Sequence, residues 1–481
     1  MNGLLVVLSL LLSVGVLFVA HDDGPPAILV CIPLAVAVAV MISRAKSDRD
    51  FLLQIFLGGL LVRVLIGLVI YTFKMQEFFG GDANTYDIFG YAMLKGWQGD
   101  QYYESLTHLY KGENGSGWGM LYLVAAIYRI TGRNMLAVQF VNSVVGAATA
   151  PVISLCALQI FENRRVAHIS ALFAAFYPSL VLWSSQGLKD GPIVFLLGLS
   201  ILATLKLGEK ISLKYLVVLV CSLFALLSLR FYVFYMMAAA ISGAFVIGMR
   251  PFTAIGFVRQ FIIIICLGLA LTYLGVTRTA GSQFETYGNL EAVQRSRLDL
   301  AQTGQSGFSR DVDVSTASGA LSIIPVGLLY LLFAPFPWQL ANLRQSITLP
   351  EMIVWWASFP LLVLGLWFTI KYRLRQSSPI LIFISMLTLA YSVFQGNVGT
   401  AYRQRSQLLV FYFIFVAVGF VLLKEKQEER KQHEQAEREA FAARQMAALE
   451  ARKRDRSRVW TGEPEDKVRE AQGKLDGVSA S

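Results

Sequence analysis

The fold is decided by apolar runs such as residues 51–72, FLLQIFLGGLLVRVLIGLVIYT, in which Arg63 is the one charged side chain. A helix needs about 20 apolar residues to cross a hydrocarbon core of about 30 Å. Backbone polar groups in lipid must pair within the segment, so a run of this length forms a helix. Residues 51–72 therefore predict a transmembrane helix.

On either side of this run the same pattern recurs between polar breaks, over residues 3–20, 26–43, 134–160, 166–186, 191–207, 213–229, 231–249, 259–277, 350–370, 378–394 and 404–423. Hydrophobic residues make up 55% of the 481 positions, charged residues make up 15%, and the mean hydropathy is +0.55. Soluble domains carry about 25% charged residues. We therefore expect an all-α polytopic membrane protein with about 12 transmembrane helices.

Basic residues between the runs predict the orientation. They gather in short loops and in a C-terminal tail, at 43–49, 163–165, 206–214, 371–375 and from 424 onward. Positive charge favours the cytoplasmic side. All of these loops can lie inside only if the stretches 117–130 and 318–342 do not span but form outer interfacial helices, and Pro335 and Pro337 interrupt the second one. We therefore expect both termini on the cytoplasmic side of the cell inner (plasma) membrane, whereas a plain hydropathy count gives about 14 spans.

The net charge of +10 does not indicate a nucleic-acid partner. The basic residues lie in the short loops or in a tail whose acidic residues nearly balance them, which is the pattern of membrane orientation. We expect contacts with membrane lipid and no nucleic acid.

This topology divides the chain into residues 1–50 with two extra N-terminal helices, 51–423 as the transmembrane domain with large outer loops 73–133 and 278–349, and 424–481 as a charged cytoplasmic tail. The tail is rich in Ala, Glu, Arg and Lys as far as Arg458, which favours a helix that continues the last span. From Trp460 onward its composition predicts disorder.

The first outer loop places a carboxylate beside the membrane. Asp82 follows Gly80 and Gly81 and precedes an amphipathic stretch. Asp82 and Tyr86 share a helix face if the helix begins at Asp82. A carboxylate here can accept a proton from a hydroxyl acceptor. The alternative is that Asp82 only caps a helix over residues 84–96.

Charged residues also stand at three other outer positions. Lys189 and Asp190 lie between two spans, Arg230 lies between two others, and Arg403 and Arg405 precede the last span. Arginine forks match phosphate oxygens, so an anionic ligand would explain them. The alternatives are a solvated turn at Lys189 and snorkelling of the arginines to lipid head groups.

The four histidines are scattered, and the four cysteines lie within apolar runs. No spacing typical of a metal site appears in the sequence. We expect no cofactor, and a divalent metal is left open.

The order of short motifs along the chain is informative: Asp82 and Tyr86, the stretch 117–128, Gly132-Arg133-Asn134, Glu162-Asn163-Arg164-Arg165, and Tyr177-Pro178-Ser179 before Lys189-Asp190. Over residues 51–423 this order resembles the GT-C-type glycosyltransferases. It is most similar to bacterial polyprenyl-phosphate-sugar transferases, which include relatives of the protein mannosyltransferases and aminoarabinose transferases. One departure is Ala83, where many members have a second acid.

The resemblance implies inverting transfer of a sugar from a polyprenyl-phosphate donor to a glycan, lipid or protein acceptor at the outer face. Asp82 would be the general base, and basic residues would hold the donor phosphate. The candidate residues are Asp82 and Asp190 for catalysis and Tyr86, Lys189, Arg230, Arg403 and Arg405 for substrate binding.

Three other functions remain open from the sequence. A polysaccharide polymerase or ligase of the O-antigen type would use the loop 278–349, with Arg295 and Arg297. A multi-span transporter would need charges at mid-depth, of which Arg63 is the main example. A scaffold would act through the tail helix.

Overall fold

The computed structural model describes residues 2–45, 48–114, 117–249, 254–303, 306–309, 312–340 and 343–461. Within these ranges the chain is built of α-helices and contains no β-strand. The predicted all-α fold is therefore confirmed.

The first half of the chain forms α1 (Asn2–Val19), α2 (Gly24–Ser43), α3 (Arg49–Thr72), α4 (Asp82–Trp97), α5 (Gln101–Asn114), α6 (Trp118–Thr131), α7 (Met135–Phe161), α8 (Arg164–Phe176), α9 (Pro178–Ser184) and α10 (Asp190–Glu209). The second half forms α11 (Leu213–Leu229), α12 (Phe231–Ile247), α13 (Ala254–Tyr273), α14 (Val276–Tyr287), α15 (Leu290–Thr303), α16 (Ala317–Phe333), α17 (Leu343–Tyr372), α18 (Leu374–Phe394), α19 (Val398–Gln404) and α20 (Ser406–Thr461).

Each apolar run predicted to cross the membrane coincides with a helix or with a bent pair of helices. In the described part of the chain, seven helices are long and apolar enough to cross. The number rises to nine if the bent pairs α8–α9 and α13–α14, with bends of 52° and 79°, each form one span. The shorter apolar helices include α1, α11 and α12. The protein is thus a multi-pass membrane protein, but the expected number of about 12 spans is not confirmed.

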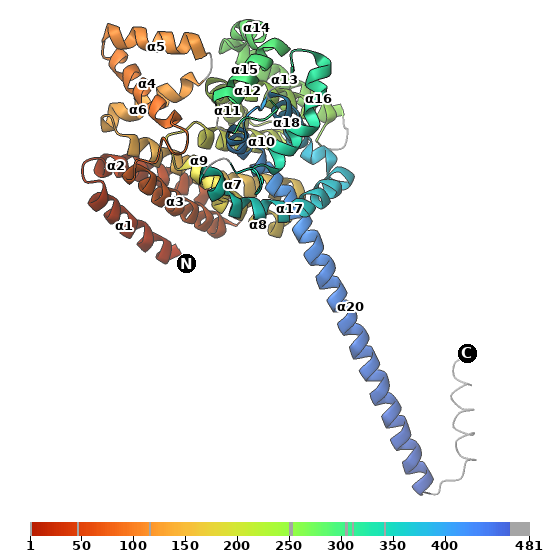
Figure 1. Ribbon diagram of the computed structural model, residues 1–481. Helices are drawn as coiled ribbons and strands as arrows, with labels where there is room; N and C mark the ends of the chain where they lie inside the picture. The colour runs from red at the N-terminus through yellow and green to blue at the C-terminus, as the bar shows by residue number, and fades with distance from the viewer. Residues whose placement is uncertain are drawn as a thin grey trace. The chain divides into compact units, whose positions relative to one another are not determined.

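Helix α7 lies at the centre of the bundle and packs against α2, α3, α8 and α10 (Figure 1). The side chain of Asn134 caps its first turn by accepting a hydrogen bond from the Ala137 N–H. Small residues let membrane helices approach closely. At Gly146, an added Cβ would lie 2.4 Å from the Ser184 Cβ, so glycine is what allows α7 to touch α9.

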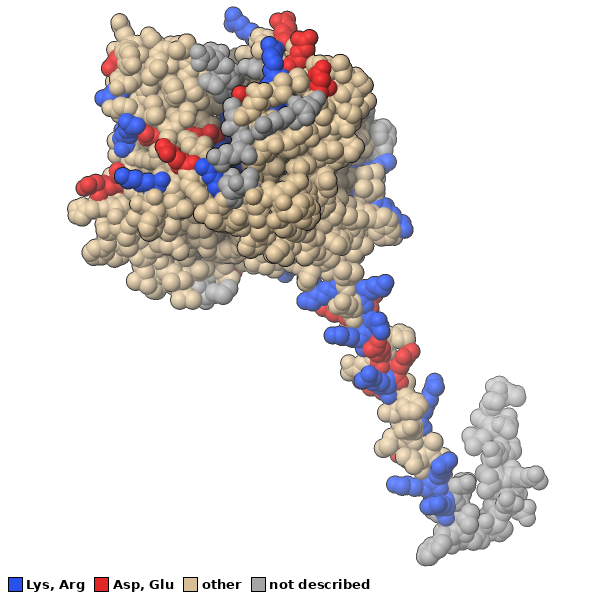
Figure 2. Space-filling model, in the orientation of Figure 1, with Lys and Arg blue, Asp and Glu red and all other residues tan. Residues whose placement is uncertain are grey.

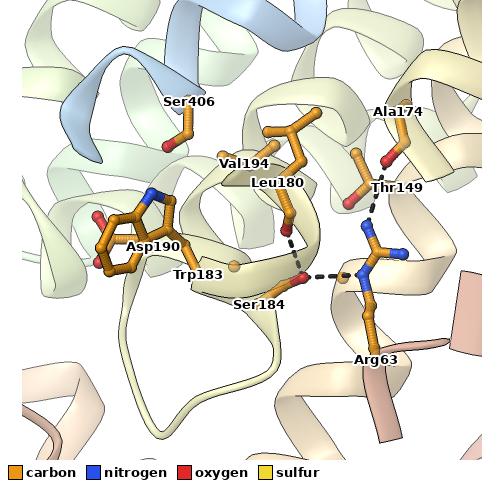
Figure 3. Close-up of a pocket in the computed structure, with 11 residues that line it drawn as sticks. Arg63, Thr149, Ala174, Leu180, Trp183, Ser184, Asp190, Val194 and Ser406 are labelled. Atoms are coloured by element: carbon orange, nitrogen blue, oxygen red, sulfur yellow. Dashed lines mark hydrogen bonds between the residues drawn. The ribbon is translucent and has the colours of Figure 1, made fainter. Parts of the chain in front are cut away.

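The predicted span 166–186 is broken, because Pro178 lacks an N–H and begins a new helix at an angle to α8. The buried Arg63 of α3 compensates by donating to the Ala175 carbonyl at 2.6 Å and to the Ala174 carbonyl at 3.1 Å. Its Nε also donates to Ser184 Oγ at 2.8 Å (Figure 3). Arg63 therefore stabilises the break in the helix.

Helices α4, α5 and α6 form a group in which α4 packs on both of the others, and α6 also contacts α11. The carboxylate of Asp87 on α4 pairs with Arg133 at 2.5 Å and accepts a hydrogen bond from Tyr128 Oη at 2.5 Å. Helix α6 coincides with the stretch 117–130.

The stretch 318–342 begins as α16, which ends at Phe333 before the two prolines, as predicted. Whether α6 and α16 lie at the interface stays a prediction.

The chain divides into two compact units, residues 1–420 and 421–481. The expected helix through Arg458 is confirmed, because α20 runs from Ser406 to Thr461. The expected disorder of the tail falls mainly on residues 462–481, which lie outside the described residues. In Figure 2 most of the visible surface of the first unit is uncharged, whereas the tail helix carries charges of both signs.

Candidate active site

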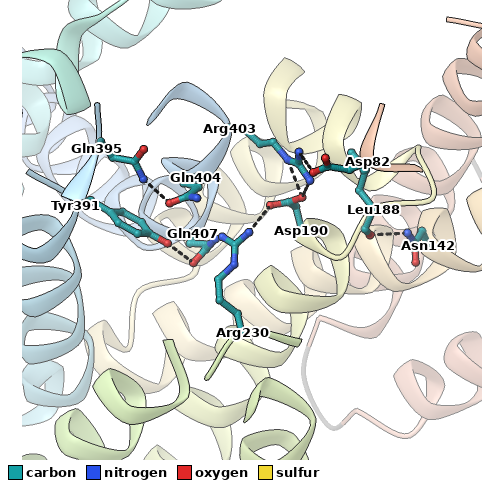
Figure 4. Close-up of polar contacts among 10 residues, drawn as sticks. All are labelled: Asp82, Asn142, Leu188, Asp190, Arg230, Tyr391, Gln395, Arg403, Gln404 and Gln407. Carbon is teal, nitrogen blue, oxygen red and sulfur yellow. Dashed lines mark hydrogen bonds and ion pairs between the residues drawn. The ribbon is translucent and has the colours of Figure 1, made fainter. Parts of the chain in front are cut away.

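Six of the seven predicted site residues lie together: five charged residues from four separate segments converge in one cluster, and Tyr86 lies beside it. Asp82 begins α4, Asp190 begins α10 directly after Lys189, Arg230 joins α11 to α12, and Arg403 lies on α19. Figure 4 shows four of them in contact. We call these five residues the charged cluster.

Arg403 is the centre of the charged cluster. Its Nη1 donates to Asp82 Oδ2 at 2.5 Å, while its Nε and Nη2 donate to Asp190 Oδ2 at 2.8 and 2.6 Å. All three guanidinium nitrogens are therefore bound to carboxylates. The indole of Trp183 lies 5.7 Å from the guanidinium carbon and covers it as a cation–π partner.

Asp82 is the exposed member of the cluster, with 48% of its side chain accessible. It is the first residue of α4, and the preceding Gly81 occupies the cap position with φ of +74° and no side-chain cap hydrogen bond. The capping interpretation of Asp82 is therefore wrong for the structure. Because the helix begins at Asp82, Tyr86 does lie one turn further on the same face.

Asp190 has no exposed side-chain surface, so the interpretation of Lys189-Asp190 as a solvated turn does not hold. A buried carboxylate needs opposite charge close by. Arg403 supplies it directly, and Arg230 Nη2 lies 3.7 Å from Asp190 Oδ1. The turn before α10 is fixed by Asn142 of α7, whose Nδ2 donates to the carbonyls of Gln186 and Leu188, each at 2.7 Å.

Lys189 forms no ion pair with any residue that the structure describes. Its ammonium lies 6.0 Å from the centre of the Tyr86 ring, which is itself buried. Burial lowers the pKa of Lys189 to about 8; Arg230 acts in the same direction, while Asp190 partly opposes it. The Lys189 ammonium is therefore charged at neutral pH, but its pKa lies only slightly above that pH.

Arg230 is 7% exposed in its side chain, and its Nη1 has no hydrogen-bond partner among the described residues. A buried guanidinium N–H without an acceptor costs free energy, and a ligand oxygen that accepts its hydrogen bond removes this cost. The charged cluster holds three cations against two carboxylates. Its excess positive charge and its free donors on Arg230 and Lys189 suit a phosphate group.

Arg405 does not join the charged cluster. It is 1% exposed and donates to the carbonyls of Leu332 and Ala334 at 2.8 and 3.0 Å, which lie at the end of α16. Because α16 ends at Phe333, these carbonyls lack the backbone donors of a continuing helix, and the arginine supplies donors to them. The expected role at the donor phosphate is not supported by this position.

Two buried residues that the sequence did not single out hold Arg403 in place. Glu351 of α17 accepts a hydrogen bond at 2.7 Å from Tyr402, the residue next to Arg403. Asn397 caps α19 by accepting from the backbone N–H groups of Gly399 and Thr400. In the sequence, only the charge of Glu351 within the predicted span 350–370 marked this residue.

A cavity lies between Arg63, Trp183, Asp190 and Ser406 (Figure 3). Its volume of about 10 Å³ holds roughly one water molecule, so a sugar does not fit there. Among the residues of the charged cluster, Asp82 has the most accessible side chain, at 48%. Among the described residues, no group of three His, Cys, Asp or Glu side chains could hold a metal ion.

Residues 117–275 match the protein family described as dolichyl-phosphate-mannose-protein mannosyltransferase, which is of the GT-C type. The match confirms the resemblance predicted from the motifs and points to a membrane glycosyltransferase that uses a lipid-linked sugar. The matched segment contains Lys189, Asp190 and Arg230, whereas Asp82 and Arg403 lie outside it. No curated protein and no solved structure matches the chain.

Proposed function

We propose that the protein moves a sugar from a polyprenyl-phosphate donor to a glycan, lipid or protein acceptor at the outer face of the plasma membrane, with both of its termini in the cytoplasm. The observation that carries the proposal is the charged cluster, in which an accessible carboxylate stands beside three cations. The family match over residues 117–275 supports the same class of reaction.

In the proposed reaction Asp82 removes the proton of the acceptor hydroxyl as the acceptor oxygen forms a bond to the anomeric carbon. The bond from that carbon to the phosphate oxygen breaks, and its electron pair leaves with the polyprenyl phosphate. One displacement of this kind inverts the configuration of the anomeric carbon.

The cations act on the leaving group. Negative charge grows on the departing phosphate, and Lys189, Arg230 and Arg403 are placed to stabilise it. These side chains supply the positive charge in this scheme, so we propose no cofactor besides the donor itself. Tyr86 lies one helical turn after Asp82, and its ring is 6.0 Å from the Lys189 ammonium, so we propose that it contacts the substrate.

The structure does not favour a polymerase or ligase that works through the loop 278–349. Arg297 is buried and donates to the carbonyls of Gln395 and Val393 at 2.5 and 3.2 Å, near the end of α18. Its guanidinium N–H groups therefore bind backbone carbonyls, and few of them are available to a glycan. The transporter interpretation loses its main support for the same reason, because Arg63 also binds helix carbonyls.

A glycan assay in whole cells separates the proposal from the polymerase alternative. Asp82→Asn should lower the rate of product formation by about 10²- to 10⁴-fold, the usual contribution of a general base. Arg295→Ala, which changes an exposed arginine of the other loop, should leave it unchanged. Full activity in Asp82→Asn, or its loss in Arg295→Ala, would contradict the proposed mechanism.

A further inference from the structure

Arg403 is shared between two carboxylates of very different accessibility. Asp190 is fully buried, and it occupies the Nε and Nη2 side of the guanidinium. Asp82 is half exposed and occupies only Nη1. The two partners are therefore not equivalent: the first is enclosed by protein, and the second can be replaced from the outside.

The backbone before Asp82 also favours its release. Gly80 and Gly81 have φ angles of +126° and +74°, and a Cβ added at either would meet open space. The N–H groups of Gly80 and Gly81 donate to the carbonyls of Glu77 and Gln76, each at 3.1 Å, but neither glycine has a side chain that a shift of the first turn of α4 would force into a neighbour. The turn before Asp190 differs, because it is buried and two of its carbonyls accept hydrogen bonds from the Asn142 side chain of α7.

A phosphate that enters between Lys189, Arg230 and Arg403 would compete with Asp82 for Nη1 of Arg403. Arginine pairs with phosphate oxygens through two parallel hydrogen bonds, which a single carboxylate oxygen on one nitrogen does not provide. While Asp82 is paired with Arg403, one of its oxygens is occupied and its negative charge is neutralised. The oxygen that accepts the Arg403 hydrogen bond is not open to the proton of an acceptor hydroxyl.

We propose that binding of the donor phosphate to Arg403 displaces Asp82 and so frees the base for the acceptor, while Asp190 is a positioning residue that holds Arg403 in both states. This inference rests on the proposed function. It changes the role expected of Asp190 from catalysis to support of the arginine, and it couples activation of the acceptor to the presence of the donor.

The test is the affinity of the purified protein in nanodiscs for farnesyl phosphate, a short polyprenyl phosphate, measured by titration calorimetry with farnesol as the neutral control. Removing the competing charge in Asp82→Asn should tighten binding about two- to five-fold, as expected for a partly exposed ion pair. Removing the supporting charge in Asp190→Asn should weaken binding about ten-fold or more, and Asp190→Glu should restore part of it.

A matched control is Asp87→Asn, which removes another carboxylate of α4 that is paired with an arginine, Arg133, outside the charged cluster. Its affinity for farnesyl phosphate should equal that of the unchanged protein. In turnover assays, Asp82→Asn should lose kcat while its KM for the donor does not rise.

The outcomes separate the two proposals. If the unchanged protein binds farnesyl phosphate no better than farnesol, the proposed phosphate site fails and the inference fails with it. If the unchanged protein binds the phosphate but Asp82→Asn binds it equally well or more weakly, the proposed function survives and the competition for Arg403 is overturned. Because Asp82 is exposed, its substitution should not prevent folding, so the second outcome can be measured.

Discussion

The pH dependence of transfer offers a stringent check on Lys189. Burial lowers its pKa to about 8, so the ammonium is charged at neutral pH and loses its charge as the pH rises through this value. Above the pKa the charged fraction falls about ten-fold per pH unit. If the ammonium holds the donor phosphate, kcat/KM for the donor should fall with that slope above about pH 8.

Two further features follow from the same charge. The bound phosphate is an opposite charge that raises the pKa of the lysine, so kcat should fall at a higher pH than kcat/KM. Lys189→Arg keeps its charge throughout this range and should remove the fall that Lys189 causes. Lys189→Gln should lower kcat/KM at neutral pH by about 10- to 100-fold, equivalent to one hydrogen bond to a charged group.

The linked effect on folding has the opposite sign. The folded-state pKa lies below the ordinary lysine value of 10.5, so between about pH 8 and 10.5 the unfolded chain binds more protons and stability rises with pH. Deprotonation of Lys189 therefore does not itself destabilise the fold in this window. The assay is transfer of a radiolabelled sugar by reconstituted protein, with Lys95→Arg on α4 as the control. An unaltered profile in Lys189→Arg would refute the assignment of the ammonium.

Other consequences can be measured on the same purified protein. Arg63→Met should lower the melting temperature in detergent, because two carbonyls at the end of α8 lose their partner at a cost of about 1–3 kcal/mol each. Gly146→Val should also lower the melting temperature, because overpacking against Ser184 costs about 1–3 kcal/mol. The control Gly15→Ala, where an added Cβ meets open space, should not lower it. Equal stability of the two glycine variants would refute the close approach of α7 and α9. Deletion of 424–481 should leave turnover measurable, whereas a scaffold acting through the tail helix would lose its phenotype.

The sequence predicted the elements of the fold well because each depends on local composition. Apolar runs, the break at Pro335 and Pro337, and the long charged helix after Lys424 are all visible in short windows. The span count was less certain, because α11 and α12 have 17 residues each and length alone does not decide whether they cross.

The candidate site was found through charges placed where charge is expensive. That rule located Asp82, Lys189, Asp190, Arg230 and Arg403, which the structure brings together. It could not locate Asn142, because a neutral polar residue inside an apolar run carries no pattern of its own. Glu351 is a charge in the predicted span 350–370, but the sequence did not indicate that it supports the short helix that carries Arg403.

The same rule also selected arginines whose guanidinium groups donate hydrogen bonds to backbone carbonyls. Arg63, Arg297 and Arg405 each donate to carbonyls at the end of a helix, and Arg259 does so at the end of α10. Such carbonyls lack helical partners, and a cation is favoured at this end of a helix dipole. Sequence alone does not separate an arginine of this kind from Arg403, since the difference is which atoms the folded chain brings to the guanidinium.

The most direct test of the central claim is mass spectrometry of lipid-linked intermediates and surface glycans from a deletion strain. We predict that one polyprenyl-phosphate sugar accumulates and one glycan modification disappears. The unchanged protein should restore both, and Asp82→Asn should restore neither. A lipid profile identical to that of the parent strain would contradict the assignment of a lipid-linked sugar as the donor.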